Sequence, residues 1–149
     1  VGGAYGNMEN AAERWINNSD FLSDSVLSRI TLENDDRKNL FSVRDLHRLI
    51  YKRTGIPIVF DYHHHQCHDG GLSEKDALNL AISTWDVKPC THYSETAQKD
   101  NPTAMFRAHS KFVENKINTY GNHIDCIIEA KGKELAVKKY LSIHGDLNA

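Results

Sequence analysis

The sequence contains little cysteine, and its three cysteines follow no recognisable pattern. Cys67, Cys90 and Cys126 are an odd number, and none of them belongs to a CxxC pair. A disulfide framework or a cysteine-based zinc finger would need such pairing, so the sequence argues against both. The same scarcity favours a reducing, intracellular setting.

Long apolar runs and an excess of basic charge are also absent. No run approaches the roughly 20 residues of a membrane span, and Val1-Gly2-Gly3 lacks the charged n-region of a signal peptide. The formal net charge is −2 and the pI is about 6.5, so overall charge alone does not indicate nucleic-acid binding. We therefore expect a globular, intracellular protein that does not bind a membrane.

Several common catalytic motifs are missing as well. The sequence has no GxSxG nucleophile elbow, no Walker A loop and no HExxH zinc motif. The glycine-rich stretch at residues 2–6 is too short for a dinucleotide-binding fingerprint. Serine hydrolases of the elbow type, P-loop enzymes and HExxH proteases are therefore poor matches.

The 149 residues do show an alternation of short apolar runs and longer amphipathic runs, in a length suited to one domain. The apolar runs predict strands over 29–35, 56–61, 87–94 and 124–130, and VGGAYG resembles the tail of an earlier strand. The amphipathic runs predict helices over 9–29, 42–54, 73–82, 104–120 and 134–143. Strands that alternate with helices imply parallel strands joined by right-handed crossovers. An open doubly wound sheet and part of a (β/α)8 barrel both fit this pattern.

Two of the expected helices carry clear end signals. Ser42 is suited to cap the helix that follows it, and Gly55 is suited to end that helix. Ser73 and Asp76 form a capping-box-like pair, with Asp in place of the usual Glu or Gln, ahead of the next helix.

Polar residues follow the apolar part of each predicted strand. The residues concerned are Glu33, Asp61, His64, His92 and Glu129. Because the carboxyl ends of parallel strands lie at one edge of a barrel or sheet, we expect these side chains to share one pocket. Carboxylate oxygens together with imidazole nitrogens suit Mn²⁺, Zn²⁺ or Fe²⁺.

Simpler explanations exist for each of these residues alone. An aspartate at a strand end is most often a helix N-cap, and the histidines at 63–65 are equally consistent with a surface loop. His109 lies in a predicted helix, where packing or capping is as plausible as metal binding. Three apolar strands that all end in an acidic residue make coincidence a weaker explanation for the set.

Four segments in their order along the chain resemble the ultraviolet-damage endonuclease family. They are LENDDR (32–37), IPIVFDYHHHQ (56–66), THYSE (91–95) and IIEAKGKE (127–134). The resemblance extends over nearly all of the chain. It implies the α/β fold of a (β/α)8 TIM barrel related to the xylose-isomerase-like superfamily.

The resemblance also implies an activity and a ligand set. Family members incise the DNA backbone immediately 5′ to a pyrimidine photoproduct in double-stranded DNA, using several divalent metal ions, usually Mn²⁺. By motif, the resemblance implies that Glu33, Asp61, His64, His92, His109 and Glu129 bind metal, with Glu33, Asp61, His64 and Glu129 also catalytic.

The chain departs from the family pattern in two ways. Family members commonly have a modified lysine two residues before the THYS-type histidine; here that position is Cys90, and Lys88 lies two residues further back. Either a local shift brings Lys88 to the site or the lysine bridge is missing. In addition, a complete barrel of this type has about 250 residues or more. We therefore expect residues 1–149 to be a single partial domain, the C-terminal half of the barrel with about four or five parallel strands, and to be inactive alone.

Two other functions fit the residues. A metal-dependent sugar isomerase or epimerase could use the same fold and ligands, and would be indifferent to DNA. A non-catalytic domain that binds a metal or a partner would retain the metal without turnover.

Overall fold

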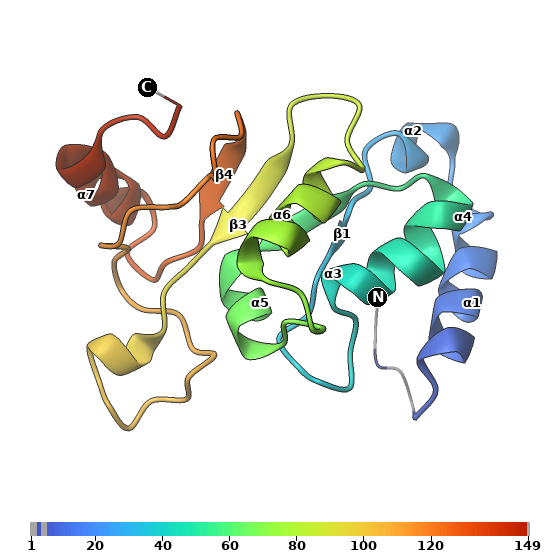
Figure 1. Ribbon diagram of the computed structural model, residues 1–149, viewed down its shortest axis with the longest axis horizontal. Coiled ribbons are helices and arrows are strands. Elements are labelled where there is room, and N and C mark those ends of the chain that lie inside the picture. The colour runs from blue at the N-terminus through green and yellow to red at the C-terminus, as the bar shows by residue number, and fades with distance from the viewer. Residues whose placement is uncertain (1–2, 4–5, 149) are drawn as a thin grey trace.

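Four parallel strands form the centre of the molecule. The computed structural model describes residue 3 and residues 6–148. The strands are β1 (Leu32–Glu33), β2 (Ile58–Asp61), β3 (Cys90–Tyr93) and β4 (Asp125–Ile128). The helices are α1 (Met8–Ser19), α2 (Asp24–Leu27), α3 (Val43–Leu46), α4 (Lys52–Thr54), α5 (Tyr62–Cys67), α6 (Glu74–Ile82) and α7 (Glu134–His144), with a π-helical turn η1 (His47–Tyr51) and a 3-10 turn η2 (Ala97–Lys99) (Figure 1).

The order of the strands distinguishes between the two architectures that the sequence left open. The order in the sheet is β1-β2-β3-β4, and every neighbouring pair is parallel. A doubly wound sheet reverses its strand order at a switch point, whereas each strand of a (β/α)8 barrel lies beside the strand before it. The described strands contain no such reversal. The expected α/β half-barrel is therefore confirmed, while the strand expected in VGGAYG lies mostly outside the described residues.

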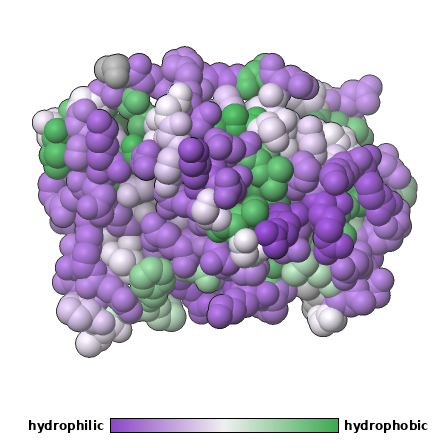
Figure 2. Space-filling view, viewed as in Figure 1, coloured by the Kyte–Doolittle hydropathy of each residue, from purple (hydrophilic) through white to green (hydrophobic). Residues whose placement is uncertain are grey.

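The two faces of the sheet have different neighbours. Ile58 and Phe60 of β2, with Tyr93 of β3, belong to the apolar core that is shared with helices α1, α3 and α6. Because side chains alternate along a strand, Asp61 and His92 point to the other face. On that face Ile127 of β4 is 52% exposed. The helix layer thus covers one face of the sheet (Figure 1), and its outer surface is mostly polar (Figure 2).

The helical run between β1 and β2 follows its end signals. The Ser42 side chain accepts the backbone N–H of Asp45, and the Asp45 carboxylate accepts the backbone N–H of Ser42, which together complete a capping box. The run continues through α3, η1 and α4 and ends at Gly55, whose φ of 70° is left-handed. Both end signals in the sequence are confirmed. Glycine suits the end of this run because few other residues tolerate a left-handed backbone.

The remaining helices follow the sequence with shifts at their ends. The amphipathic run at 9–29 forms α1 and the short α2, with a turn between them. Ser73 caps α6 by accepting the backbone N–H of Asp76 at 3.1 Å. The three histidines at 63–65 lie in α5 and not in a surface loop, and the side chains of His63 and His65 are buried. No helix in the described part of the chain combines the length and apolar character needed to cross a bilayer.

The helix expected over 104–120 is absent, and this prediction is wrong. The segment is irregular because several of its backbone groups bond to other segments of the chain. Thr96 and His109 form an antiparallel bridge, and the N–H of Ser110 donates to the carbonyl of Glu95 at 2.8 Å. Val113 and Ile117 are two of the apolar residues that suggested a helical period. Both are buried, although the segment that carries them is not helical.

Candidate metal centre

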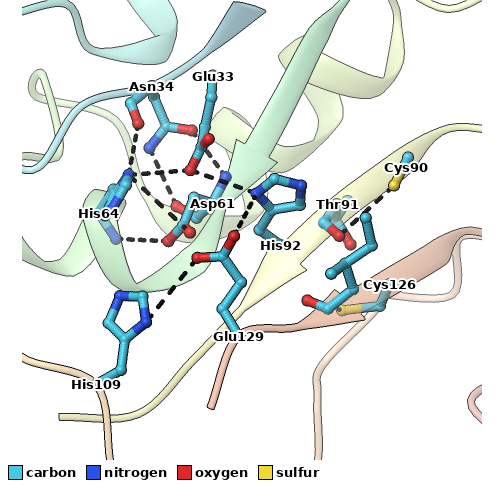
Figure 3. Close-up of polar contacts among 11 residues, drawn as sticks. Glu33, Asn34, Asp61, His64, Cys90, Thr91, His92, His109, Cys126 and Glu129 are labelled. Atoms are coloured by element: carbon cyan, nitrogen blue, oxygen red, sulfur yellow. Dashed lines mark hydrogen bonds and ion pairs between the residues drawn. The ribbon is translucent and has the colours of Figure 1, made fainter. Parts of the chain in front are cut away.

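The carboxyl ends of the four strands bring the predicted residues to one place. Glu33 ends β1, Asp61 ends β2, His92 lies in β3, and Glu129 directly follows β4. Glu33, Asp61 and His92 each offer one donor atom, and these atoms all lie within 4.8 Å of one another. Figure 3 shows the cluster at the ends of the strands, with His64 and His109 beside it. The parallel sheet therefore assembles residues that are far apart in the sequence.

The distances join all six candidates in one chain of contacts. Nδ1 of His92 lies 3.4 Å from Oε1 of Glu33 and 3.4 Å from Oε1 of Glu129. Nδ1 of His64 lies 3.2 Å from Oε1 of Glu33 and 4.0 Å from Oδ2 of Asp61. Nδ1 of His109 lies 3.9 Å from Oε2 of Glu129, so His109 lies at the edge of the cluster.

Asp61 caps a helix and still has one unpaired oxygen, so the two roles that the sequence left as alternatives are compatible. Its Oδ1 atom accepts the backbone N–H of His64 at 2.7 Å, which caps helix α5. Its Oδ2 atom is buried and has no hydrogen-bond partner among the described residues. Burial raises the pKa of Asp61 to about 6, with the charges of Glu33 and Glu129 adding to the shift and His64 opposing it. One oxygen thus anchors the helix while the other remains available to a cation.

Asn34 holds Asp61 in place through the backbone. The side chain of Asn34 donates to the carbonyl of Asp61 at 3.0 Å and accepts the backbone N–H of Asp61 at 2.8 Å. These two bonds continue the β1–β2 pairing beyond the last backbone pair. Nothing in the sequence indicated this bridging role of Asn34.

The orientation of His64 is fixed by the same segment. Nδ1 of His64 lies 2.8 Å from the carbonyl oxygen of Asn34. A carbonyl can only accept, so Nδ1 carries a proton and Nε2 is the nitrogen suited to a metal. Burial lowers the pKa of His64, but the hydrogen bond with Glu33 and the charge of Asp61 outweigh it and raise the pKa to about 9.

Glu33 and His92 complete a charged network. The contact with the Glu33 carboxylate is the largest cause that raises the pKa of His92. Burial by itself would raise the pKa of Glu33, but its contacts with His64 and His92 outweigh it, so the pKa of Glu33 lies below its ordinary value. Glu33 is therefore ionised near neutral pH, and the protonated imidazole of His64 lies beside it.

His109 comes from a loop that other segments hold in place. The buried carboxylate of Glu95 accepts the backbone N–H groups of Glu114 at 2.9 Å and Asn115 at 2.7 Å through Oε1. Its Oε2 atom lies 2.5 Å from Nζ of Lys99. Sequence reasoning missed Glu95, and only its position directly after the THYS motif could have suggested a role.

A second contact ties the His109 loop to the segment after Glu129. The N–H of Lys131 donates to the carbonyl of Ser110 at 3.0 Å, and the N–H of Gly132 donates to the carbonyl of Lys111 at 2.8 Å. A Cβ atom at Gly132 would lie 2.6 Å from the Lys111 carbonyl oxygen. Glycine is therefore required for this close approach.

The structure also shows where Lys88 and Cys90 lie relative to the site. Nζ of Lys88 lies 2.5 Å from Oδ1 of Asp125, at the start of β4 and away from the strand ends. No local shift brings Lys88 to the site, so that alternative is wrong. Cys90 lies two residues before His92 in β3 and therefore on the same face of the sheet.

Unpaired buried atoms fit a cation at this place. Oδ2 of Asp61 and Nδ1 of His92 are both buried without a hydrogen bond within the described chain. Buried polar atoms are seldom left unpaired unless an ion or water completes them. A mixture of carboxylate oxygen and imidazole nitrogen is the donor set preferred by divalent transition metals. The residues present therefore fit a divalent metal site.

Comparisons with known proteins agree with this geometry. UV DNA damage endonucleases of Bacillus cereus (strain Q1) and Bacillus anthracis are each 34% identical to this chain over 155 residues, a match that covers 95% of this chain and 46% of theirs. The crystal structure of SacUVDE is similar with a TM-score of 0.83 and 30% identity, over 99% of this chain and 50% of that one. The chain thus spans about half the length of the relatives it matches. A model of the family described as UV-endonuclease UvdE matches residues 1–148, and the chain belongs to that family.

Proposed function

We propose that this chain contributes half of the active site of a metal-dependent DNA repair endonuclease. In this proposal, the enzyme incises the backbone of double-stranded DNA 5′ to ultraviolet photoproducts, inside the cell. The observation that carries the proposal is the convergence of Glu33, Asp61, His92 and Glu129 from four strands in a chain of this family. Family membership favours this function over the sugar isomerase and the non-catalytic domain.

We assign the metal ligands to the six clustered residues. Glu33, Asp61 and His92 would form the centre of the site, and His64, His109 and Glu129 would lie around it. Mn²⁺ is the favoured ion, with Zn²⁺ or Fe²⁺ as alternatives. A bound divalent cation would supply positive charge that lowers the pKa of water and offsets the charge of a phosphodiester.

The protein's own groups then prepare the site. Asn34 fixes the backbone on either side of Asp61, and the Asn34 carbonyl sets the orientation of the His64 ring. The Glu95 carboxylate fixes the loop that carries His109. Because these supporting bonds are made by rigid or buried elements, the ligands are held close to their final positions before a cation binds.

The test is nicking of supercoiled plasmid by the full-length protein. We expect nicking of irradiated plasmid in the presence of Mn²⁺, and none with EDTA. Unirradiated plasmid at equal concentration is the matched control. Equal nicking of both plasmids would contradict the lesion-specific function, and nicking that persists in EDTA would contradict the metal requirement.

A further inference from the structure

Two large apolar side chains are exposed side by side next to the candidate metal centre. Met105 is 65% exposed and Phe106 is 43% exposed, and Arg107 follows them. They lie in the loop that leads to His109, two to four residues before this candidate ligand. Contiguous exposed apolar surface with a polar rim is one feature of sites that contact a partner.

The pair lines a hollow that borders the metal centre. The cavity has a volume of about 460 Å³, and its lining residues are Asp36, Gln66, Cys67, Met105, Phe106 and Arg107. The lining residues come from three segments of the chain. Each segment has a candidate ligand within three positions in the sequence of one of its lining residues. These ligands are Glu33, His64 and His109. His63 links the hollow to this edge, because its ring centroid lies 5.4 Å from that of Phe106 and 5.8 Å from that of His109.

The exposed pair is held in a fixed position. The N–H of Ala108 donates to the carbonyl of Met105 at 2.9 Å, which closes a turn around the pair. Nε2 of Gln98 donates to the carbonyl of Ala104 at 2.9 Å on the other side. The Phe106 ring packs on the fully buried His63, with ring centroids 5.4 Å apart. Phe106 therefore rests on the core with one part of its ring while the rest is exposed.

The polar part of the hollow is cationic as well as acidic. Nε of Arg107 lies 3.8 Å from Oδ2 of Asp36, a separation too long for a hydrogen bond. The guanidinium N–H donors are therefore not consumed by this carboxylate. An exposed aromatic ring beside an arginine is the combination that proteins use to hold a single nucleotide, with the ring stacking on the base and the cation facing the phosphate.

We propose that Met105 and Phe106 form a stacking platform for a DNA base beside the cleaved phosphodiester, and that Arg107 contacts the adjoining phosphate. The partner is a nucleotide of the DNA strand held at the metal centre. This inference rests on the proposed endonuclease function and extends it to three residues outside the ligand set.

The test compares Phe106→Ala with Phe21→Ala in the full-length protein. Phe21 is 87% exposed and lies in the turn between α1 and α2. These two helices lie on the right of Figure 1, whereas the loop after β3 lies at the lower left. Binding is measured by fluorescence anisotropy on a labelled, irradiated duplex with EDTA present, so that cleavage does not compete. Phe106→Tyr keeps an aromatic ring and serves as the conservative variant.

We expect Phe106→Ala to raise Kd about 5- to 150-fold, the range for loss of one base–aromatic stack. Phe21→Ala and Phe106→Tyr should bind as the unsubstituted protein does. The slope of log Kd against log salt concentration should be unchanged in Phe106→Ala. In Arg107→Ala the magnitude of this slope should fall by about one, because one phosphate contact is lost.

The outcomes separate the inference from the proposed function. If the unsubstituted protein nicks and binds irradiated DNA but Phe106→Ala binds equally well, the stacking platform is wrong and the endonuclease function stands. An unchanged salt slope in Arg107→Ala would contradict the phosphate contact. If the unsubstituted protein binds no DNA, both the proposed function and this inference are overturned.

Discussion

The side chain of Asn34 exchanges two hydrogen bonds with the backbone of Asp61, as a neighbouring strand would. Both residues are almost completely buried. The carboxylate at the end of β2 is therefore positioned by an amide at the end of β1. The positions of the other groups depend on this contact, because the Asn34 carbonyl also orients His64.

Asn34→Ala should destabilise the protein and weaken metal binding together. The substitution leaves a buried N–H and a buried carbonyl of Asp61 unpaired, which costs about 1–3 kcal/mol per group. The free energy of unfolding in urea and the metal content by elemental analysis measure the two effects. Asn17→Ala, at an exposed position in α1, is the matched control and should change neither quantity.

Asp61→Ala and Glu129→Ala should both lose bound metal and nicking activity, but with different effects on folding. Asp61 is completely buried and caps α5, so its loss should cost about 1 kcal/mol of unfolding free energy in addition. Glu129 is half-buried at the rim, so its loss should leave stability nearly unchanged. Thermal unfolding and metal analysis of both variants check this. Full metal content in both would show that the ligand assignment is wrong.

Glu95→Ala should loosen the loop that carries His109. The N–H groups of Glu114 and Asn115 lose their acceptor, so their amide hydrogens should exchange faster with solvent. Hydrogen exchange followed by mass spectrometry measures the change, and Glu95→Gln, which keeps an acceptor oxygen, should restore most of the protection. Unchanged exchange in the alanine variant would contradict the clamp.

Metal binding should release a proton from His64. Its pKa of about 9 means that the imidazole is protonated in the metal-free protein at pH 7.5, and a metal ligand must be neutral. Affinity for Mn²⁺ should therefore fall as pH decreases below about 9. Calorimetry in two buffers of different ionisation enthalpy counts the protons released, and His64→Gln should release fewer.

The same shift sets a pH window for the metal-free protein. The folded pKa of His64 lies above its unfolded value of about 6.5. The stabilisation it contributes is therefore complete below pH 6.5 and is lost as pH rises through about 9. Chemical unfolding with EDTA across this range measures the loss, and His64→Gln should show a flatter profile.

The sequence predicted the elements whose signals are local. Ser42 and Gly55 marked the ends of one helix because capping and a left-handed backbone depend on a few neighbouring residues. The clustering of the strand-end side chains was predictable because parallel strands share one edge. All six predicted site residues lie in one chain of contacts, and the motif resemblance was confirmed by the family match.

The parts that sequence reasoning missed depend on contacts between distant segments. The period of apolar residues at 104–120 suggested a helix, but Glu95 binds the backbone of this segment from 19 and 20 residues away. The bridge from Asn34 to Asp61 likewise spans 27 residues. Nothing local in the sequence distinguishes these residues from ordinary loop residues.

The close approach at Gly132 has a mechanical consequence. The Lys111 carbonyl oxygen occupies the space that a Cβ atom at residue 132 would need. The segments after His109 and Glu129 are therefore in close backbone contact at this point. Gly132→Ala would push these two segments apart without altering a single donor atom of the site. The spacing between the segments that carry His109 and Glu129 is therefore set by the absence of a side chain at residue 132.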